Sequence, residues 1–424
     1  MAPRLLRGAD VAVGAGIVLL PFALLHARAL ADLIVSATGA LFLLRSALLG
    51  TWDWMRRPWV RVAALLWLWL LLATAIEGPA HAVVQAAVVL RLLLFVVACE
   101  AWALRDARTR RWLGLATAAA AVWVAVECWQ QLLTGANLFG AVRWGDGALT
   151  GPFVKPHAGS SYLAVLFPAV LPPALRLIRR GDLRGWLGAL LLLAAAAATM
   201  VLIGQRMPTL LMALGLVFAA LLVPALRLPA LAALALGALV IALTPIVSPP
   251  TYQKLVLHFL DQMQHFWDSN YGQIYLRALA MVQASPLFGV GVDGFRDDCL
   301  NPAFVHGNAL LGVSDAQVNL AIGCNIHPHN YWLQMATSGG LPALLAFGVL
   351  VALWLGRILR GLDPAVAPMR AALLVMLATL LWPIASSSSL FVIDAGGWVF
   401  LAAGWGLAEA AAAAASDRQA DAGA

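Results

Sequence analysis

The chain has 424 residues, of which 62% are hydrophobic and only 11% are charged. A soluble domain carries roughly 25% charged residues, so a soluble globular fold is excluded because so few charges cannot cover this much apolar surface. The net charge of +7 comes almost entirely from arginine, since Lys155 and Lys254 are the only lysines, and we interpret it as the arginine bias of one side of a membrane rather than as a nucleic-acid-binding surface.

Continuous apolar runs of about 20 residues predict membrane-spanning α-helices, and their lack of alternation excludes a β-barrel. We therefore predict an all-α, polytopic membrane protein with about twelve transmembrane helices and one large helical loop in the periplasm. The predicted spans cover residues 10–26, 29–50, 60–76, 82–104, 112–134, 158–178, 186–203, 207–226, 229–247, 330–357, 366–385 and 390–414.

The first apolar run has some features of a signal peptide, because Arg4 and Arg7 precede it and the stretch Ala27-Arg28-Ala29 follows it. We expect an uncleaved first span, since many more spans follow. Placing the N-terminus in the cytoplasm puts nineteen of the 27 basic residues on the cytoplasmic side, seven outside and Arg91 within a span. This asymmetry predicts that both termini are cytoplasmic.

One long hydrophilic segment, residues 248–329, then falls outside the membrane. It separates the predicted helices of residues 1–247 from those of residues 330–414, and we expect a disordered tail over residues 415–424. Within the segment, "SNYGQIYLRALAMVQASP" predicts a helix that ends at Pro286. A loop of this length is far longer than ordinary connections, which indicates a functional role.

The four cysteines divide into two pairs. Cys99 and Cys128 fall within spans and are interpreted as small buried residues. Cys299 and Cys324 both fall in the outer segment, where an oxidising compartment favours a disulfide. Two separate thiols are the alternative.

Two arginines on the predicted outer side are candidates for binding an anion. Arg206 lies at the outer mouth between two spans, where an arginine is costly unless it is paired or faces water. Its alternative role is to reach the lipid headgroups. Arg277 lies on the predicted helix of the outer segment and has an exposed surface position as its alternative. The following Gly289, Gly291 and Gly294 imitate a phosphate-binding motif, but without a strand–turn–helix context we favour a tight turn.

The stretch "IHPHNYWLQMATSGGLP" places His327, His329 and Asn330 at the entrance to a span. An imidazole is well suited to accept a proton near neutral pH, so His329 is a candidate general base. We expect His327 to point elsewhere once the helix starts, and Asn330 is a candidate helix cap. A capping or interfacial histidine is the alternative for His329.

A second outer loop, "RWGDGALTGPFVKPHAGSSYLA", adds Arg143, Lys155 and His157 as candidate substrate-binding residues, with an ordinary polar turn as the alternative. A metal site is the main competing interpretation of the histidines. Zinc requires three or four ligands at defined spacing, and the chain contains no His-x-x-x-His or Cys-x-x-Cys motif, so we expect neither a metal nor another cofactor.

Four segments together resemble the O-antigen ligase superfamily, the bacterial membrane transferases that include lipopolysaccharide core O-antigen ligases, O-antigen polymerases and protein O-oligosaccharyltransferases. The segments are "LTGPFVKPHAGSSYLA", "GQRMPTLL", "YLRALAMVQASPLFGVGVDGF" and "HPHNYWLQMATSGGLP". Their order and predicted outer location carry the resemblance. One departure from the ligase pattern is Ala343, which stands where the pattern has Gly, Thr or Tyr.

The resemblance implies a glycosyltransferase of the bacterial inner membrane that moves O-antigen from undecaprenyl diphosphate onto lipid A–core and thereby completes lipopolysaccharide. It implies that Arg206 and Arg277 hold the diphosphate, that His329 is the general base, and that transfer inverts the anomeric carbon without a metal. The partners would be the lipid-linked O-antigen, lipid A–core and membrane lipids, without nucleic acid.

Two other functions stay open. An O-antigen polymerase, which extends lipid-linked repeat units, belongs to the same superfamily. A transporter or flippase would show inverted repeats and charged residues near mid-span. Arg91 and Glu127 are candidates for such residues, but no repeat is visible and the long outer segment favours an enzyme.

Overall fold

The computed structural model describes residues 2–385 and 388–423. Every regular element among them is a helix, so the predicted all-α fold is confirmed. The helices that correspond to predicted spans are α1 (Ala2–His26), α2 (Arg28–Leu49), α3 (Pro58–Glu77), α4 (Ala82–Val88), α5 (Leu90–Ala98), α6 (Ala107–Thr134), α7 (Ala158–Ile178), α8 (Leu183–Ile203), α9 (Arg206–Leu222), α10 (Arg227–Val247), α15 (Tyr331–Leu359), α16 (Pro368–Leu380) and α17 (Ile393–Gly423).

In the described part of the chain, ten helices are long and apolar enough to cross a membrane, counting α4, α5 and the π-helix Cys99–Ala103 as one continuous span. The apolar helices α9 and α16 are shorter than the other ten. Together they occupy the twelve predicted positions, as expected for a polytopic membrane protein.

Local sequence signals explain where several of these helices begin and end. The side chains of Asp106 and Asp182 accept hydrogen bonds from the first-turn N–H groups of α6 and α8. Left-handed glycines follow α2, α6 and α8, since Gly50, Gly135 and Gly204 all have positive φ.

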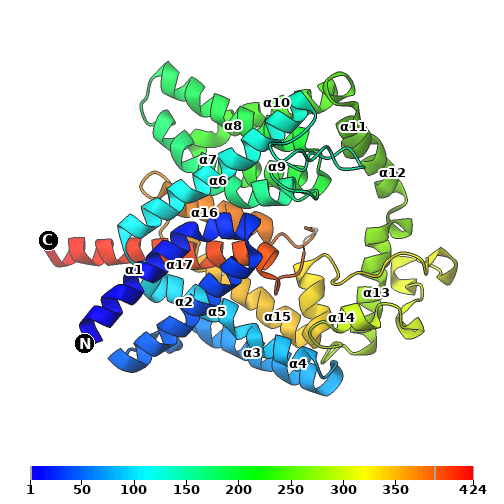
Figure 1. The fold of residues 1–424 in the computed structure, drawn as a ribbon, viewed down its shortest axis with the longest axis horizontal. Helices are drawn as coiled ribbons and strands as arrows, with labels where there is room; N and C mark the ends of the chain where they lie inside the picture. The colour runs from blue at the N-terminus through cyan, green and yellow to red at the C-terminus, as the bar shows by residue number, and fades with distance from the viewer. Residues whose placement is uncertain (1, 386–387, 424) are drawn as a thin grey trace.

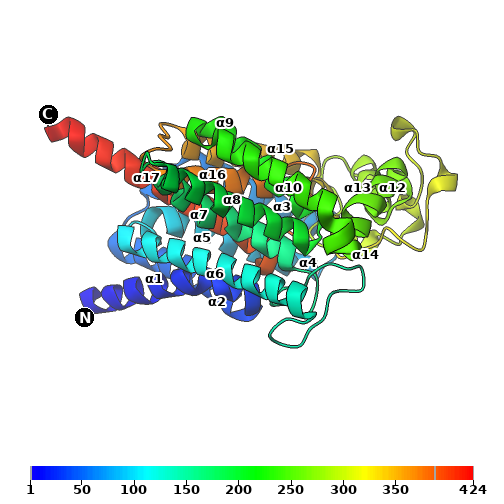
Figure 2. The same ribbon diagram turned by 90° about the horizontal axis from the view of Figure 1, so that it is seen from above.

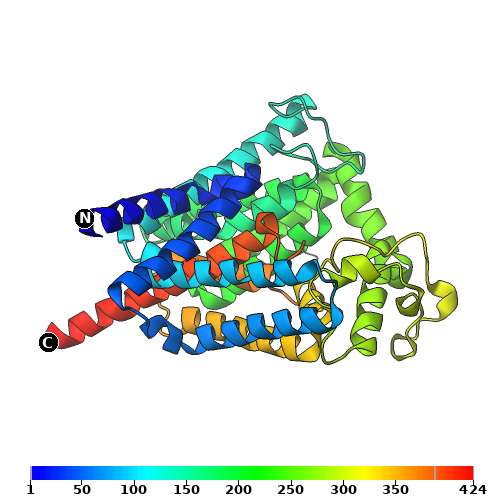
Figure 3. The same ribbon diagram turned by 60° about the horizontal axis from the view of Figure 1, so that its bottom comes forward.

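The helices form two groups that share an apolar core (Figures 1 and 2). Helices α6 to α10 pack on one another, and α3 lies against α15 in the second group (Figure 3). Contacts of α16 with α7, α9 and α17, and of α1 with α6, join the groups. Both termini lie at one end of this bundle (Figure 1).

The segment between Val247 and Tyr331 lies at the opposite end of the bundle from the termini (Figure 1). It contains the short helices α11 (Pro249–Tyr252), α12 (His258–Gln264) and α14 (Gly294–Asp298) and the longer α13 (Asn270–Ala284). Helix α13 ends just before Pro286, as predicted. We call this part of the molecule the outer domain and its end of the bundle the outer end.

Helix α15 is broken at Gly339 and Gly340, which have non-helical backbone angles. The segment after α13 packs into this break, because Val290 N donates to Thr337 O at 2.7 Å and Leu341 N donates to Pro286 O at 2.8 Å. Gly340 and Gly289 both have positive φ, and a Cβ on either would clash with backbone atoms of the other segment. The close approach at Gly289 and Gly340 therefore anchors the outer domain to a span.

The glycines at 289 and 291 form the tight turn that we favoured over a phosphate loop. Gly291 has a φ of 81° and packs on Gly78 at the end of α3, where a Cβ would come within 2.6 Å of the Gly78 Cα. The neighbouring Val292 N donates to the Thr74 hydroxyl at 3.0 Å. These contacts hold the turn against two spans.

The structure describes residues 415–423 of the expected disordered tail (415–424), and they are helical. Helix α17 continues to Gly423, well beyond the end of the apolar window at Ser416. The alanine run from Ala410 to Ala415 explains the continuation, because alanine has the highest intrinsic helix propensity.

Candidate active site at the outer end

Arg206 begins α9 immediately after the left-handed turn at Gly204. Its side chain is half-buried. The Nε donates to the carbonyl of Lys254 at 2.8 Å, and Nη1 donates to the Gln262 side chain. Arg206 therefore connects the start of a span to the first part of the outer domain.

Two further cations lie near Arg206. Arg143 Nη1 donates to the Ser248 hydroxyl at 2.9 Å and to Gly147 O at 3.2 Å, and burial lowers the pKa of its guanidinium. Lys254 forms an ion pair with Asp146, which also interacts electrostatically with Arg206. The structure thus brings Arg143, Lys254 and Arg206 together from three separate segments.

The start of α7 lies against the start of α9. The Gln205 side chain donates to Pro156 O, and Gly159 packs so closely on Gln205 that a Cβ would clash. Lys155 and His157, which flank Pro156, are exposed, and the His157 ring meets Phe153 edge-on at 6.2 Å between centroids. Both candidates therefore lie next to the turn that carries Arg206.

His329 is positioned by the residues just before α15. It has a φ of 51°, in the left-handed region that residues other than glycine seldom adopt. Its half-buried ring meets the ring of Tyr271 edge-on, with 5.6 Å between centroids. Tyr271 also interacts electrostatically with Arg206, so this tyrosine interacts with two of the three predicted catalytic residues.

His327 lies beside His329, which corrects our expectation that the two would point apart. Their ring centroids are 4.4 Å apart, because the chain reverses at Pro328 and His329 before the helix begins. His327 is 6% exposed, and neither ring nitrogen has a hydrogen-bond partner among the described residues. Burial, with a smaller contribution from His329, lowers the pKa of His327 to about 4. It is therefore neutral at pH 7.

Asn330 caps α15, as its position predicted. Its Oδ1 accepts from Trp332 N at 2.9 Å and from Leu333 N at 3.0 Å, and its amide donates to Pro383 O at 2.7 Å. The Tyr275 hydroxyl also interacts with it. Asn330 thus fixes the entrance of α15 directly next to His329.

Arg277 points to the other side of α13. A helix turns through about 200° in two residues, so Tyr271 and Tyr275 share one face while Gln273 and Arg277 share the opposite one. Arg277 is 1% exposed, and its guanidinium donates to three carbonyls: Cys299 O at 3.0 Å, Asn319 O at 3.0 Å and Ile322 O at 2.6 Å. In this structure it holds the outer domain together rather than facing His329.

Cys299 and Cys324 form a disulfide, with 5.2 Å between their Cα atoms. The pairing that the sequence left open is therefore present in the structure. It closes the same segment that Arg277 holds through Cys299 O and Ile322 O. The outer domain is thus stabilised on one side of α13 by a covalent bond and by a buried guanidinium.

Sequence reasoning missed Tyr271, Gln262 and Lys254. The tyrosines of "YGQIY" are four residues apart, which signals a common helix face, but nothing in the sequence shows which partner that face meets. Gln262 and Lys254 carry no motif. In the described ranges, no group of three or more His, Cys, Asp or Glu residues is placed to hold a metal ion.

The fold and the site define a polytopic membrane protein with an imidazole and several cations gathered beneath a helical domain at one end of the bundle. Residues 189–348 match the family model described as O-Antigen ligase, and this stretch includes Arg206, Arg277 and His329. The predicted resemblance to the O-antigen ligase superfamily is therefore confirmed over these residues, and the match supports a function of the ligase or polymerase type. No curated protein matches the chain.

Proposed function

We propose that the protein is a glycosyltransferase that moves O-antigen polysaccharide from undecaprenyl diphosphate onto lipid A–core. The observation that carries this proposal is that Tyr271 contacts His329 and also interacts electrostatically with Arg206, within the residues that match the family. A half-buried cation and an imidazole at the same membrane surface suit a reaction between two lipid-anchored substrates. The proposed location is the inner membrane, with the outer end in the periplasm and both termini in the cytoplasm.

In the proposed reaction, His329 acts on the acceptor. An acceptor hydroxyl attacks the anomeric carbon of the donor sugar, and the bond between that carbon and the diphosphate oxygen breaks. The hydroxyl proton moves to a ring nitrogen of His329, and undecaprenyl diphosphate leaves. Direct displacement inverts the anomeric carbon. The Asn330 cap and the ring contacts with Tyr271 and His327 hold the imidazole in place.

Arg206 acts on the donor. Its guanidinium can donate forked hydrogen bonds to the diphosphate and stabilise the charge that develops on the leaving group. The N-terminus of α9 reinforces this role, because the first N–H groups of a helix have no carbonyl partner within it and attract anions. Charge neutralisation of this kind requires no metal.

Arg277 is proposed to contribute by positioning. A direct contact with the diphosphate, which the resemblance implies, requires its guanidinium to leave the three carbonyls that it now holds. The outer domain carries Tyr271 on the opposite face of α13, so fixing this helix also fixes the site. Both roles predict lost transfer on substitution, but only the direct role predicts weaker donor binding in a folded outer domain.

The other candidates are proposed to bind glycan or phosphate around this centre. Arg143 lies close to the Arg206 cluster, and Lys155 and His157 are exposed beside the start of α9. His327 is proposed to orient His329. For Asn330, capping and a hydrogen bond to Pro383 already occupy the amide, so its contribution to substrate binding acts through the placement of His329.

An in vitro transfer assay in EDTA tests the proposal. The purified protein is given lipid-linked O-antigen and either lipid A–core or a second lipid-linked repeat as the acceptor. Ligation to lipid A–core is the expected result. Chain extension on the lipid-linked acceptor alone would identify a polymerase instead. A strict requirement for Mg²⁺ or Mn²⁺ would contradict the metal-independent mechanism, and no transfer to either acceptor would contradict both functions.

A further inference from the structure

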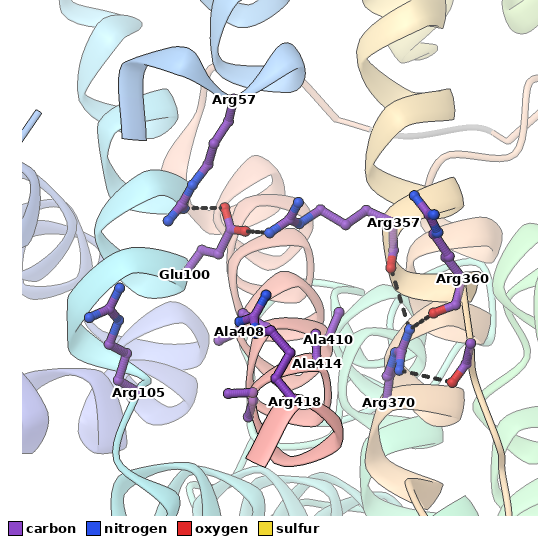
Figure 4. Close-up of a pocket in the computed structure, with 14 residues that line it drawn as sticks. Arg57, Glu100, Arg105, Arg357, Arg360, Arg370, Ala408, Ala410, Ala414 and Arg418 are labelled. Atoms are coloured by element: carbon purple, nitrogen blue, oxygen red, sulfur yellow. Dashed lines mark hydrogen bonds and ion pairs between the residues drawn. The ribbon is translucent and has the colours of Figure 1, made fainter. Parts of the chain in front are cut away.

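A pocket of about 880 Å³ lies at the end of the bundle that carries both termini, opposite the candidate active site (Figure 4). This volume is within the roughly 300–1,000 Å³ of typical small-molecule sites. The pocket is lined by one acid, Glu100, and six arginines. The arginines are Arg57, Arg105, Arg357, Arg360, Arg370 and Arg418. Its charge is therefore strongly positive.

Glu100 is a buried acid that lines the pocket, and its carboxylate forms ion pairs with two arginines. Its side chain is 0% exposed and lies between two arginines, with 2.7 Å to Arg57 Nη1 and 2.7 Å to Arg357 Nη2 (Figure 4). Trp59 Nε1 also donates to this carboxylate at 3.1 Å. Because two guanidinium groups share one carboxylate, this buried group keeps an excess positive charge toward the pocket.

Arg370 neutralises the partial negative charge of the carbonyl groups at the end of α15. It is 3% exposed, and its guanidinium donates to the carbonyls of Arg357, Ile358, Arg360 and Gly361. The last carbonyls of a helix have no partner within it and carry the negative end of the helix dipole. With these carbonyls engaged, the pocket presents cations without opposing carbonyl oxygens.

Three arginines of the pocket remain available to bind a ligand. The side chains of Arg105, Arg360 and Arg418 are exposed, and none makes a hydrogen bond or ion pair with another described residue. Arg105 lies in the connection after the fourth span, Arg360 at the end of α15 and Arg418 in the last turns of α17. Between these arginines the pocket is lined by alanines of α17, including Ala408, Ala410 and Ala414, whose small side chains leave the space open (Figure 4).

We propose that this pocket binds a phosphate-bearing anion, with Arg105, Arg360 and Arg418 donating to its oxyanions. The position of the pocket at the ends of the spans favours a phospholipid headgroup as the source. Arg57 directly precedes α3, Arg105 follows the fourth span and Arg360 caps α15, so these guanidinium groups lie where the spans end. Basic pockets between span ends on the cytoplasmic side suit anionic headgroups. A soluble phosphate compound offers the same chemistry from solution.

Native mass spectrometry of the full-length protein in neutral detergent tests the site. The probes are diphosphatidylglycerol, the zwitterionic lipid phosphatidylcholine and inorganic pyrophosphate. We expect diphosphatidylglycerol to bind at least tenfold more tightly than phosphatidylcholine. The double variant Arg105→Gln/Arg360→Gln should bind diphosphatidylglycerol at least tenfold more weakly than the wild type. The double variant Arg105→Lys/Arg360→Lys should lose less affinity, because lysine keeps the positive charge although it lacks the paired N–H donors of a guanidinium.

The matched control is Arg180→Gln/Arg184→Gln, which removes two exposed arginines outside the pocket, one in the α7–α8 connection and one in the first turn of α8. It should change lipid affinity by less than about twofold, and all variants should elute as the wild type does in size-exclusion chromatography. Binding of pyrophosphate alone, with the same dependence on Arg105 and Arg360, would support the anion site and identify a soluble source. Equal lipid affinity in the pocket variant and the control, with no pyrophosphate binding, would overturn the proposal.

Discussion

Arginines gather at both ends of the bundle, and the two ends use them in the same two ways. Arg277 at the outer end and Arg370 at the opposite end are almost fully buried and donate to backbone carbonyls. Arg206 is half-buried, and Arg105 and Arg360 are exposed. Burial with several carbonyl partners identifies an arginine that holds backbone segments together, whereas partial exposure leaves a guanidinium available to an anion. A motif position alone does not separate these roles.

The largest effect is expected from the imidazole at the outer end. His329→Ala and His329→Asn should each lower transfer by about 10²–10⁴-fold, because general base catalysis contributes this much. Asparagine tolerates the left-handed backbone of this position but cannot accept the proton. His329→Asn therefore distinguishes the loss of the general base from an effect of backbone strain. The measurement is the in vitro transfer rate.

His306→Asn is the control for these variants, since His306 is an exposed histidine of the same outer domain. It should transfer at the wild-type rate. Near-normal lipopolysaccharide bearing O-antigen from cells that carry His329→Asn would refute the assignment of His329 as the base.

Arg277→Ala tests whether this arginine holds backbone segments together or binds the donor diphosphate. Loss of the guanidinium leaves three buried carbonyls without their donor, so we expect the outer domain to lose about 3 kcal/mol of stability. Hydrogen exchange should rise in the segment between Cys299 and Cys324. The exposed Arg296 of the same domain is the control, and Arg296→Ala should leave exchange unchanged.

Unchanged exchange in Arg277→Ala, together with a raised KM for the lipid-linked donor, would contradict the positioning role. That result would instead show that the guanidinium leaves its carbonyls to bind the diphosphate. Arg277→Lys should restore little of the exchange protection, because an ammonium group cannot span three carbonyls in the geometry of a planar fork.

Arg206 is expected to behave in the opposite way. Arg206→Ala should raise the donor KM by roughly tenfold, and Arg206→Lys should rescue only part of this, since a charged hydrogen bond to phosphate contributes about 1.5–3 kcal/mol. The exposed Arg28 provides a control at another position, and Arg28→Ala should leave the KM unchanged. A wild-type KM in Arg206→Ala would remove the proposed diphosphate contact.

The sequence predicted the spans well because their signal is local. Each apolar run must form a helix in a membrane, where an unpaired backbone group is costly, so length and composition are enough to locate α1 to α10 and α15 to α17. The helical end of α17 was not predicted, for a related reason. The prediction used apolarity, whereas alanine continues a helix through its propensity.

The site was only partly predictable, because contacts between distant segments decide it. The resemblance predicted His329 and Arg206 as site residues, but Tyr271 and Gln262 contact them only once α12 and α13 fold over the bundle. The direction of Arg277 depends on which face of α13 meets residues 299–322. The glycines at 339 and 340 are explained by the close approach of Pro286 to α15, which no local pattern encodes.

The buried histidine of the site should affect stability rather than transfer. His327 has a folded-state pKa of about 4, below the ordinary value of 6.5, so the unfolded chain binds a proton first as the pH falls. Stability is therefore unaffected at pH 7 and decreases between about pH 6.5 and pH 4. At pH 5 the decrease from this group is about 2 kcal/mol. Thermal unfolding in detergent at pH 7 and pH 5 should show a smaller loss in His327→Gln than in the wild type, whereas the control His306→Gln should match the wild type. An equal loss in His327→Gln would show that the buried imidazole does not titrate as its surroundings imply.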